Sequence, residues 1–512
     1  MQWQGPNLFP LNYKQQVILL IAGAVLFKLA LGGQVELNND EAYYWTYARH
    51  LQWNYFDHPP MVALFIRVFS LNLHAHQEIF LRLPGIVTAA ASTWIIFKTG
   101  ILLKDQLTGL IAAFLFTASF YAAVIAGLLI LPDTPQLLFW TASVYLLLDI
   151  IKRESLRRPV SNRLLLAGLA IGLCILSKVH GVFLWAGFLG YCFFDRRSLL
   201  KHPSLYAGMG ISLLLLAPSL WWTFGNHFSN YNYHSARVNF RHLHMDSLFR
   251  EIAGELLYNN PVNTFLLVLS MLLFRKNYNG AVLLKWLSLP LILTVIGISL
   301  FNDTLPHWSG PAYSSLTPLT ALYLRTNIIG SAIPRAVRWS LSIAAAALVI
   351  SVLIINGYPG TLGEKKMPEW GRGDVTLDMS GWRQITDSLQ QHLGPDTPAS
   401  LITNFWFPGG HLDFYASHQL GIPVRVVGSL NDIHHFAWLN PKLAPLQQGQ
   451  NAWFITLSNF LKKPPPLLLS CFRNTAAPLA IPQFRSGRIV RYLYLYRLEG
   501  YTGGLPQDGI LP

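Results

Sequence analysis

Repeated apolar runs of about bilayer length constrain the fold of this 512-residue chain more than any other feature. A transmembrane helix needs about 20 consecutive apolar residues, and runs of this kind recur between residues 15 and 357. Hydrophobic residues make up 52% of the chain and charged residues only 12%, about half the charged share of a soluble domain. This composition excludes an ordinary soluble enzyme and a disordered chain. It indicates a multi-pass α-helical membrane protein.

The apolar runs predict about eleven transmembrane helices. The first is expected to be retained, because no small-residue cleavage pattern of a signal peptide follows it. Two of the spans are short, and they flank Lys178 and His180. The predicted spans cover residues 15–31, 80–102, 107–129, 132–151, 163–177, 180–194, 204–222, 261–274, 282–301, 311–327 and 338–357.

The distribution of charge predicts the orientation. With a cytoplasmic N-terminus, the inside loops are rich in Lys and Arg and the outside loops are rich in Asp and Glu, which is the positive-inside bias. Two long loops, at about 33–79 and 223–260, then lie outside. We predict a membrane domain over residues 1–358 and an extracytoplasmic α/β domain over residues 359–512. In the latter we expect a helix at 381–393 and strands at 400–407, 424–427, 451–457 and 488–498.

Several classes of function find no support in the sequence. The net charge of +14 comes without a basic run interleaved with aromatic residues, so no nucleic-acid partner is expected. The histidines lack the spacing of a zinc site, and the three cysteines are scattered. No phosphate-binding loop or dinucleotide fingerprint is present. ATP and dinucleotides are therefore not supported as ligands.

Two adjacent carboxylates follow the first span. Asp40 and Glu41 stand just before Tyr43, Tyr44 and Trp45. A carboxylate at the edge of a low-dielectric region is costly unless it is paired or used, and one of a close pair can act as a base toward a hydroxyl. The alternative is an acidic loop with an interfacial aromatic belt, and the spacing alone leaves both interpretations open.

Two further acids lie in predicted outside segments. Asp57 and His58 precede two consecutive prolines, which fix the backbone and present both side chains rigidly. A plain turn is the alternative interpretation. Asp133 begins the fourth span, where it is either a helix N-cap or a second acid facing the same cavity.

Basic side chains gather on the same predicted side. Lys178 and His180 lie between two short spans, and a lysine among apolar spans needs an anion unless it snorkels to the interface. Arg237 and Arg241 add cations in the second long loop. His307 joins the ninth and tenth spans, and on its own it is more often a structural histidine.

These acids and bases gather on the outer face only, where ATP and nucleotide sugars are not supplied. A group-transfer enzyme on that face needs an activated donor carried in the membrane. A polyprenyl-phosphate sugar fits this requirement, because its tail is apolar and its phosphate leaving group suits Lys and Arg.

An ordered set of motifs over about residues 15–330 resembles bacterial membrane glycosyltransferases of the GT-C fold. The nearest members are the protein O-mannosyltransferases and the aminoarabinose transferases acting on lipid A, of glycosyltransferase family 39 and its neighbours. The ordered set is specific, whereas each motif alone is weak. The motifs are Asn39-Asp40-Glu41-Ala42-Tyr43-Tyr44-Trp45, Tyr55-Phe56-Asp57-His58-Pro59-Pro60, Pro132-Asp133-Thr134-Pro135, Leu176-Ser177-Lys178 and Pro306-His307-Trp308.

The resemblance implies roles for individual residues. Asp40 matches the expected catalytic acid or base, with Glu41 beside it. Asp133 matches the second acid, and Lys178 resembles a cavity lysine. Asp57 and the residue after it fall where relatives have an acid followed by a base. The aminoarabinose transferases carry Lys at that second place, so the histidine found here is a departure from the pattern.

We therefore expect a transferase that moves a sugar from a polyprenyl-phosphate donor to a hydroxyl of lipid A, another glycan or a protein, with inversion. It would act at the periplasmic or outer face of a bacterial inner (plasma) membrane. The expected phosphate ligands are Lys178, His58, Arg237 and Arg241, and the expected cavity residues are Tyr43, Tyr44, His180, His307 and Trp308. No metal is required, although Asp40, Asp57 and His58 carry ligand atoms for one.

Two other classes of function remain open at this stage. A transporter or flippase of lipid-linked sugars would explain the spans and the lysine among them. It would predict repeated halves with helices broken near the middle of the membrane, and no such repeat is found. A non-catalytic partner in envelope assembly, with the tail as a binding module, is the second.

Overall fold

The computed structural model describes residues 11–236, 238, 242–273, 279–327, 332–393 and 397–511. Its contacts divide the chain into two compact units. We call Met1–Ala30, Arg82–His227 and His234–Ala347 the helical unit, and Leu31–Leu81, Phe228–Tyr233 and Leu348–Pro512 the mixed unit. The boundary after residue 358 remains a prediction, and the contacts group residues 31–81 with the C-terminal part of the chain.

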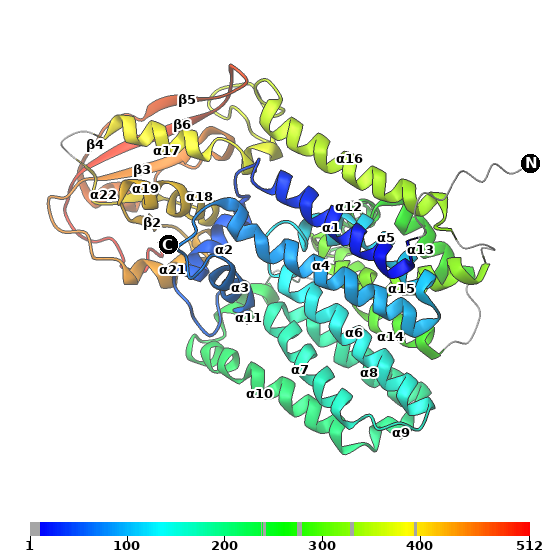
Figure 1. Cartoon of the computed structure of the whole chain (residues 1–512). Helices are drawn as coiled ribbons and strands as arrows, with labels where there is room; N and C mark the ends of the chain where they lie inside the picture. Colours follow the sequence, from blue (N-terminus) through cyan, green and yellow to red (C-terminus); the bar gives the residue numbers. More distant parts are fainter. Residues whose placement is uncertain are drawn as a thin grey trace, which may run out of the picture. The chain divides into compact units, whose positions relative to one another are not determined.

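In the helical unit, the residues that the structure describes form helices and no strand; the helices are labelled in Figure 1. Three of them, α1, α4 and α16, continue into the mixed unit. The helices are α1 (Tyr13–Gly32), α4 (Glu78–Leu103), α5 (Gln106–Ala118), η1 (Tyr121–Ile125), α6 (Asp133–Ser155), α7 (Ser161–Ser177), η2 (Val179–Gly181), α8 (Val182–Asp195), α9 (Arg197–Leu200), α10 (Pro203–Gly225), α12 (Met245–Tyr258), α13 (Pro261–Leu273), α14 (Asn279–Ser299), η3 (Pro306–Ser309), α15 (Gly310–Asn327) and α16 (Arg335–Gly357).

In the described part of the chain, six helices are long and apolar enough to cross a membrane: α1, α4, α6, α10, α14 and α16. The pair α12 and α13, bent by 102°, would make a seventh if it forms one span. A multi-pass membrane protein is thus confirmed, but the predicted count of eleven spans is not. The difference has a local cause, because α7 and α8 have only 17 and 14 residues, and the run predicted at 107–129 ends as α5 at Ala118 before the π-helix η1.

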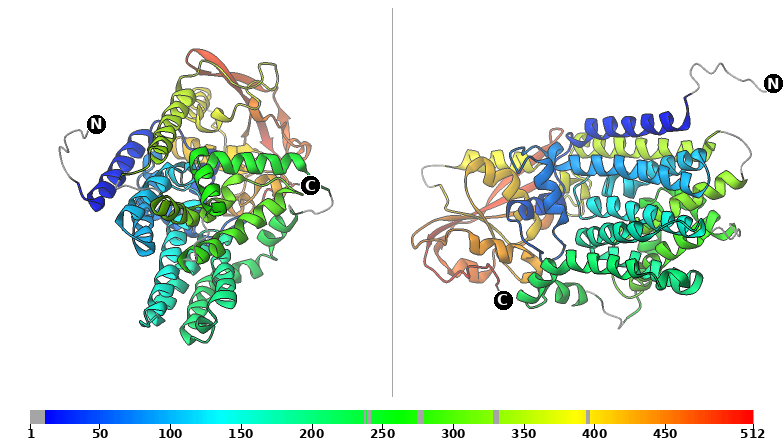
Figure 2. Two further views of the ribbon diagram at one scale, coloured as in Figure 1. Left: turned by 90° about the vertical axis from the view of Figure 1, so that its right-hand side faces the viewer. Right: turned by 60° about the horizontal axis from the view of Figure 1, so that its bottom comes forward.

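Close helix packing forms the centre of the helical unit. α6 packs against α7, α7 against α10, and α14 against both α8 and α15; Figures 1 and 2 show α6, α7, α8 and α10 side by side. Trp140, Ile171 and Phe188 are fully buried in this core. A Cβ on Gly168 would lie 2.2 Å from the carbonyl oxygen of Gly208, so α7 and α10 can approach this closely only with small residues at the contact.

The mixed unit contains a six-stranded sheet with the order β2-β1-β3-β6-β4, and β5 also pairs with β6. β1 is parallel to β2 and β3, whereas β6 is antiparallel to β3, β4 and β5. The strands are β1 (Leu401–Thr403), β2 (Val424–Val426), β3 (Ala452–Leu457), β4 (Phe472–Thr475), β5 (Leu479–Arg485) and β6 (Arg488–Tyr501).

Short helices complete the mixed unit, and several of them pack against the sheet. The longest in the C-terminal part is α17, whose Trp382, Ile385 and Leu389 are buried at helical spacing. It packs against β5 through a hydrogen bond from the Phe484 amide to the side chain of Gln384. The helices are α2 (Asn39–Arg49), α3 (Met61–Phe69), α11 (Ser229–Ala236, which extends into the helical unit), η4 (Val375–Met379), α17 (Trp382–His392), α18 (Trp406–His411), η5 (Leu412–Ser417), α19 (His418–Leu420), α20 (Leu430–Ile433), α21 (Phe436–Leu439), η6 (Asn440–Lys442), η7 (Ser458–Phe460) and α22 (Pro466–Ser470).

The C-terminal elements largely follow the sequence-based expectations. The predicted helix at 381–393 is α17, and the strands predicted at 424–427, 451–457 and 488–498 are β2, β3 and β6. The strand predicted at 400–407 ends early, because α18 begins at Trp406. β4 and β5 are strands that the sequence analysis did not predict.

Candidate active site

The first acidic pair lies in the first turn of α2. Asn38 caps this helix by accepting a hydrogen bond from the Glu41 amide at 2.8 Å. The Asn38 amide donates in return to Glu41 Oε2 at 3.0 Å, which completes a capping box. Glu41 is fully buried, whereas Asp40 is exposed. The two neighbouring carboxylates therefore differ in kind: Glu41 holds the start of the helix, and Asp40 is the accessible acid at its N-terminal end, where the helix dipole favours negative charge.

Asp57 is held by two tyrosines of α2. The Tyr43 hydroxyl donates to Asp57 Oδ1 at 3.3 Å, and the Tyr47 hydroxyl donates to the same oxygen. Burial, and then the charge of Asp57, raises the pKa of Tyr43 and Tyr47 well above its usual value, so both hydroxyls stay protonated donors. His58 lies near Tyr44, with ring centroids 5.8 Å apart. α2 thus brings Asp57 into a hydrogen-bonded cluster.

Residues from the C-terminal part of the chain contact α2 directly. A Cβ on Gly410 would lie 2.9 Å from the backbone of Ala42 and Tyr43, so α18 meets α2 at a position where a larger residue does not fit. His411 Nε2 lies 3.0 Å from the side-chain oxygen of Asn39, the first residue of α2. The backbone amide of His435 donates to the Tyr43 hydroxyl at 3.0 Å. The turn that carries Asp40 is therefore packed against residues some 370 positions further along the chain.

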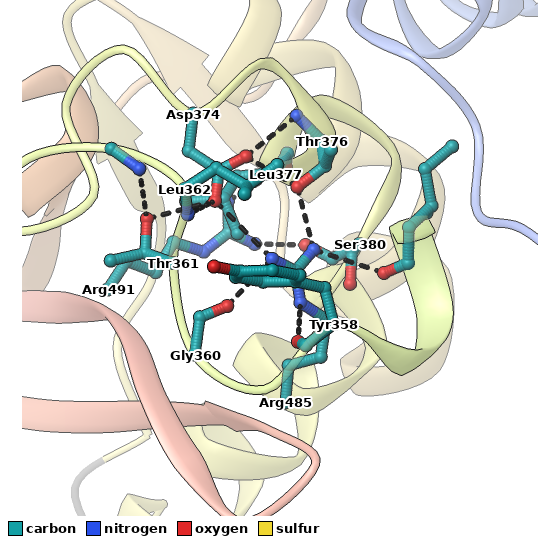
Figure 3. A network of polar contacts seen from close by, with 12 residues as sticks. Tyr358, Gly360, Thr361, Leu362, Asp374, Thr376, Leu377, Ser380, Arg485 and Arg491 are labelled. Carbon is teal, nitrogen blue, oxygen red and sulfur yellow. Dashed lines mark hydrogen bonds and ion pairs between the residues drawn. The ribbon is translucent and has the colours of Figure 1, made fainter. Parts of the chain in front are cut away.

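The mixed unit also contains a buried polar network around Asp374, Arg485 and Arg491 (Figure 3). Asp374 accepts hydrogen bonds from Thr361, Thr376 and the Leu362 amide, and it forms an ion pair with Arg485 at 3.4 Å. Arg491 donates to the backbone oxygens of Leu377 and Ser380 at 3.0 and 2.8 Å.

The same arginine links this network to α2. The guanidinium of Arg491 lies 4.8 Å from the centre of the Trp382 ring. Trp382 in turn stacks on His411, with ring centroids 3.8 Å apart, and His411 contacts Asn39 at the start of α2. Strand β6, helix α17 and helix α2 are thus joined by one chain of contacts.

A cavity of about 280 Å³ borders the C-terminal half of α2 within the mixed unit. Its polar lining residues include His50 and the ion pair between Arg49 and Asp413. The apolar lining residues include Phe436 and Leu439. α2 therefore carries candidate catalytic groups at its N-terminal turn and faces this cavity with its C-terminal turn.

In the helical unit, Asp133 and Lys178 form a buried ion pair. Lys178 Nζ lies 2.9 Å from Asp133 Oδ2, and their side chains are 4% and 2% exposed. The Tyr121 hydroxyl donates to Asp133 Oδ1 at 3.1 Å. Pro132, not Asp133, occupies the N-cap of α6, so the carboxylate is directed to a charged partner and does not cap its own helix. Lys178 is buried and paired, which distinguishes it from a snorkelling lysine.

The predicted histidines of the helical unit lie in two short turns. His180 is in η2, with its ring 6.0 Å from that of Trp308 in η3. Burial, and then the charge of Lys178, lowers the pKa of His307 to about 4. This imidazole is therefore neutral at physiological pH and lies within electrostatic reach of the ion pair.

The structure thus places the predicted residues in two groups. Asp40, Glu41, Tyr43, Tyr44, Asp57 and His58 belong to the mixed unit, and Asp133, Lys178, His180, His307 and Trp308 to the helical unit. Arg237 and Arg241 lie outside the described residues. Among the residues that are described, no three His, Cys, Asp or Glu side chains gather as a metal site, so Asp40, Asp57 and His58 do not form one.

Sequence reasoning did not find several residues of these two groups. Tyr121 donates to Asp133 but stands in an apolar run without any polar signal. Gln136 is a polar residue inside an apolar span, three positions after Asp133. On a helix this spacing places both side chains on one face, so the sequence alone could have indicated Gln136. His411 and His435 belong to a region in which no motif was recognised.

Comparisons with known proteins agree with this architecture. Residues 57–222 match the family described as dolichyl-phosphate-mannose-protein mannosyltransferase. The lipid A galacturonosyltransferase RgtD of Rhizobium johnstonii is 20% identical over 343 residues, which cover 65% of this chain and 69% of that protein.

Solved structures show the same fold. ArnT from Cupriavidus metallidurans bound to undecaprenyl phosphate superposes with a TM-score of 0.63 at 14% identity, over 94% of this chain and 98% of that one. Its apo state gives a TM-score of 0.62 at 13% identity, with the same coverage. The family match, the relative and the shared fold together support a membrane glycosyltransferase, and they confirm the resemblance to GT-C enzymes that the sequence motifs indicate.

Proposed function

We propose that the protein transfers a sugar from a polyprenyl-phosphate donor to an acceptor hydroxyl. The observation that carries the proposal is the buried pair of Asp133 and Lys178 among apolar helices, because charged groups placed inside a membrane domain mark functional sites. The ArnT structure bound to undecaprenyl phosphate supports this class of donor. RgtD, which is named for lipid A, supports an acceptor of the cell envelope, and lipid A, another glycan and a protein all fit.

In the proposed reaction, Asp40 accepts the proton of the acceptor hydroxyl. The acceptor oxygen forms a bond to the anomeric carbon while the bond from that carbon to the phosphate oxygen breaks. The electron pair of the broken bond leaves with the polyprenyl phosphate. A single displacement of this kind inverts the anomeric centre. The exposure of Asp40 and the engagement of Glu41 in the capping box support Asp40 as the base and Glu41 as the residue that orients it.

The phosphate is proposed to be held by Lys178 and His58, with Arg237 or Arg241. An ammonium group has three donors, so Lys178 can bind a phosphate oxygen while it remains close to Asp133. Asp133 and Asp57 are proposed as second acids that orient their neighbours. The further proposed cavity residues are Tyr43, Tyr44, His180, His307 and Trp308. We place the reaction and the C-terminal region on the extracytoplasmic side of a bacterial inner membrane, as the charge distribution predicts.

Comparison of the lipids and glycans of a deletion strain tests this function in the cell. Mass spectrometry should show one sugar-modified envelope component missing from the deletion strain and restored by the wild-type gene. Asp40→Asn, produced at the same level, should not restore it. Full restoration by that variant would contradict the proposed base. An unchanged set of components, with accumulation of an unused lipid-linked sugar on one face of the membrane, would favour a transporter.

A further inference from the structure

Gln136 is a buried polar residue that the proposed mechanism does not use. It lies in α6, its side chain is fully buried, and neither amide atom has a hydrogen-bond partner among the residues that the structure describes. A side-chain amide offers two donor hydrogens and an acceptor oxygen. An amide that is buried without partners destabilises a protein relative to an apolar side chain of the same size. The position is therefore unfavourable for folding unless another molecule satisfies it.

The location of Gln136 indicates what that molecule is. It follows Asp133 by three residues, so the two side chains lie on the same face of α6, and the Asp133 carboxylate already contacts Lys178 and Tyr121. One turn further along this face, the indole N–H of Trp140 donates a hydrogen bond to the Ser315 hydroxyl of α15 at 2.7 Å, so this polar group has a partner. On this face of α6, Asp133 and Trp140 therefore have hydrogen-bonding partners, whereas Gln136, which lies between them, has none among the described residues.

A second unpartnered group lies close to the ion pair of Asp133 and Lys178. The Nδ1 atom of His180 is buried and has no hydrogen-bond partner in the described part of the chain. His180 is within electrostatic reach of both Lys178 and Asp133. The ion pair thus has two unpartnered polar groups near it: His180, and Gln136 one helical turn after Asp133. This combination suits an oxygen-rich molecule that also carries negative charge, such as a sugar attached to a phosphate.

We propose that Gln136 and His180 form hydrogen bonds to the head group of the donor, either to its sugar hydroxyls or to its phosphate oxygens. The inference rests on the proposed function and extends it by adding Gln136 as a binding residue and by giving His180, already a proposed cavity residue, a specific contact. It accounts for a polar side chain whose removal would otherwise favour folding. An ordered water molecule could also satisfy the amide, and the experiment below separates the two.

The test compares Gln136→Leu with a control of opposite expectation. Gln136→Leu removes an unpartnered amide at similar volume, so we expect a melting temperature about 1–3 °C above wild type without ligand. The control is Asn263→Leu, which removes a buried amide with two partners, the Leu115 carbonyl and the Ser340 hydroxyl. We expect this control to lower the melting temperature and leave ligand affinity unchanged.

Ligand affinity is read from the rise in melting temperature on titration of the detergent-purified protein. One arm uses undecaprenyl phosphate, and a second uses the same lipid bearing mannose or galacturonic acid. We expect Gln136→Leu to weaken binding about two- to tenfold, the effect of one lost hydrogen bond. Weakening in both arms assigns the contact to the phosphate, and weakening only with the sugar-bearing lipid assigns it to the sugar. Gln136→Met and His180→Phe should behave in the same way.

Unchanged affinities of Gln136→Leu and His180→Phe in both arms would overturn the inference and leave a water-filled or purely structural site. Wild-type protein that binds neither lipid would refute the proposed donor, and this inference would fall with it. The two failures are thus distinguishable, because only the second concerns the wild-type protein.

Discussion

Lys178→Met should destabilise the helical unit strongly, because it removes one partner of a buried ion pair. The two side chains are 4% and 2% exposed and their charged atoms are 2.9 Å apart. Loss of one member leaves the Asp133 carboxylate uncompensated among apolar helices, which costs about 3–5 kcal/mol. The Tyr121 hydroxyl keeps its hydrogen bond to that carboxylate, so we expect the lower end, about 3 kcal/mol. Each 1.4 kcal/mol is a tenfold change, so the unfolding constant should rise by about two orders of magnitude.

The double variant Lys178→Met/Asp133→Asn should recover most of this loss, because a neutral amide has no buried charge to compensate. The assay is reversible unfolding of the purified protein and its three variants in mixed micelles of dodecyl sulfate, completed as a double-mutant cycle. Wild-type stability of Lys178→Met, with additive effects in the cycle, would refute the buried pair. If Lys178 also holds the donor phosphate, the double variant should regain stability but not sugar transfer.

Three further outcomes follow from the mixed unit and the topology. Burial, and then the charge of Lys442, lowers the pKa of His50 to about 4. The unfolded protein therefore binds a proton at His50 more readily than the folded protein as the pH falls from about 6.5 toward 4. Over that pH range, the free energy of unfolding of the wild-type protein should fall more steeply than that of His50→Gln. Gly410→Ala should lower turnover by displacing the α2 backbone, whereas Gly357→Ala, where a Cβ meets nothing within 4 Å, should leave turnover unchanged; equal turnover of both variants would argue against the role of this contact. A reporter fused after Pro512 should be active only outside the cytoplasm, and activity of a cytoplasmic-type reporter there would overturn the orientation.

The architecture of the mixed unit shows what local patterns can and cannot predict. The helix α17 and the strands β2, β3 and β6 were predictable because their periodicity is local. The Asn38-x-x-Glu41 spacing of a capping box was also visible in the sequence and explains why the two acids differ. The contact of Gly410 and His411 with α2 leaves no local pattern, because it joins segments about 370 residues apart.

For the helical unit, the sequence-based prediction was wrong for a different reason. Hydropathy identified an apolar run at 107–129, but it gave no sign that the α-helix in this run ends before Ser119 and is followed by the π-helix η1. Apolar composition alone also could not distinguish α7 and α8, which are shorter than a typical span, from full spans. The pairing of Lys178 with Asp133, 45 residues apart, depends on the packing of α6 against α7. Both residues were identified from the sequence, but their partnership was not.

Sugar transfer by the purified protein tests the central claim most directly. The assay supplies a polyprenyl-phosphate donor with a radiolabelled sugar and an envelope acceptor, and it compares wild type, Asp40→Asn and Glu41→Gln at matched thermal stability. We expect wild type to release polyprenyl phosphate in step with acceptor labelling. Asp40→Asn should be slower by about 10²–10⁴-fold, the usual contribution of a general base, and Glu41→Gln should lose less. Near-wild-type transfer by Asp40→Asn, or no transfer by the wild-type protein from any such donor, would contradict the account.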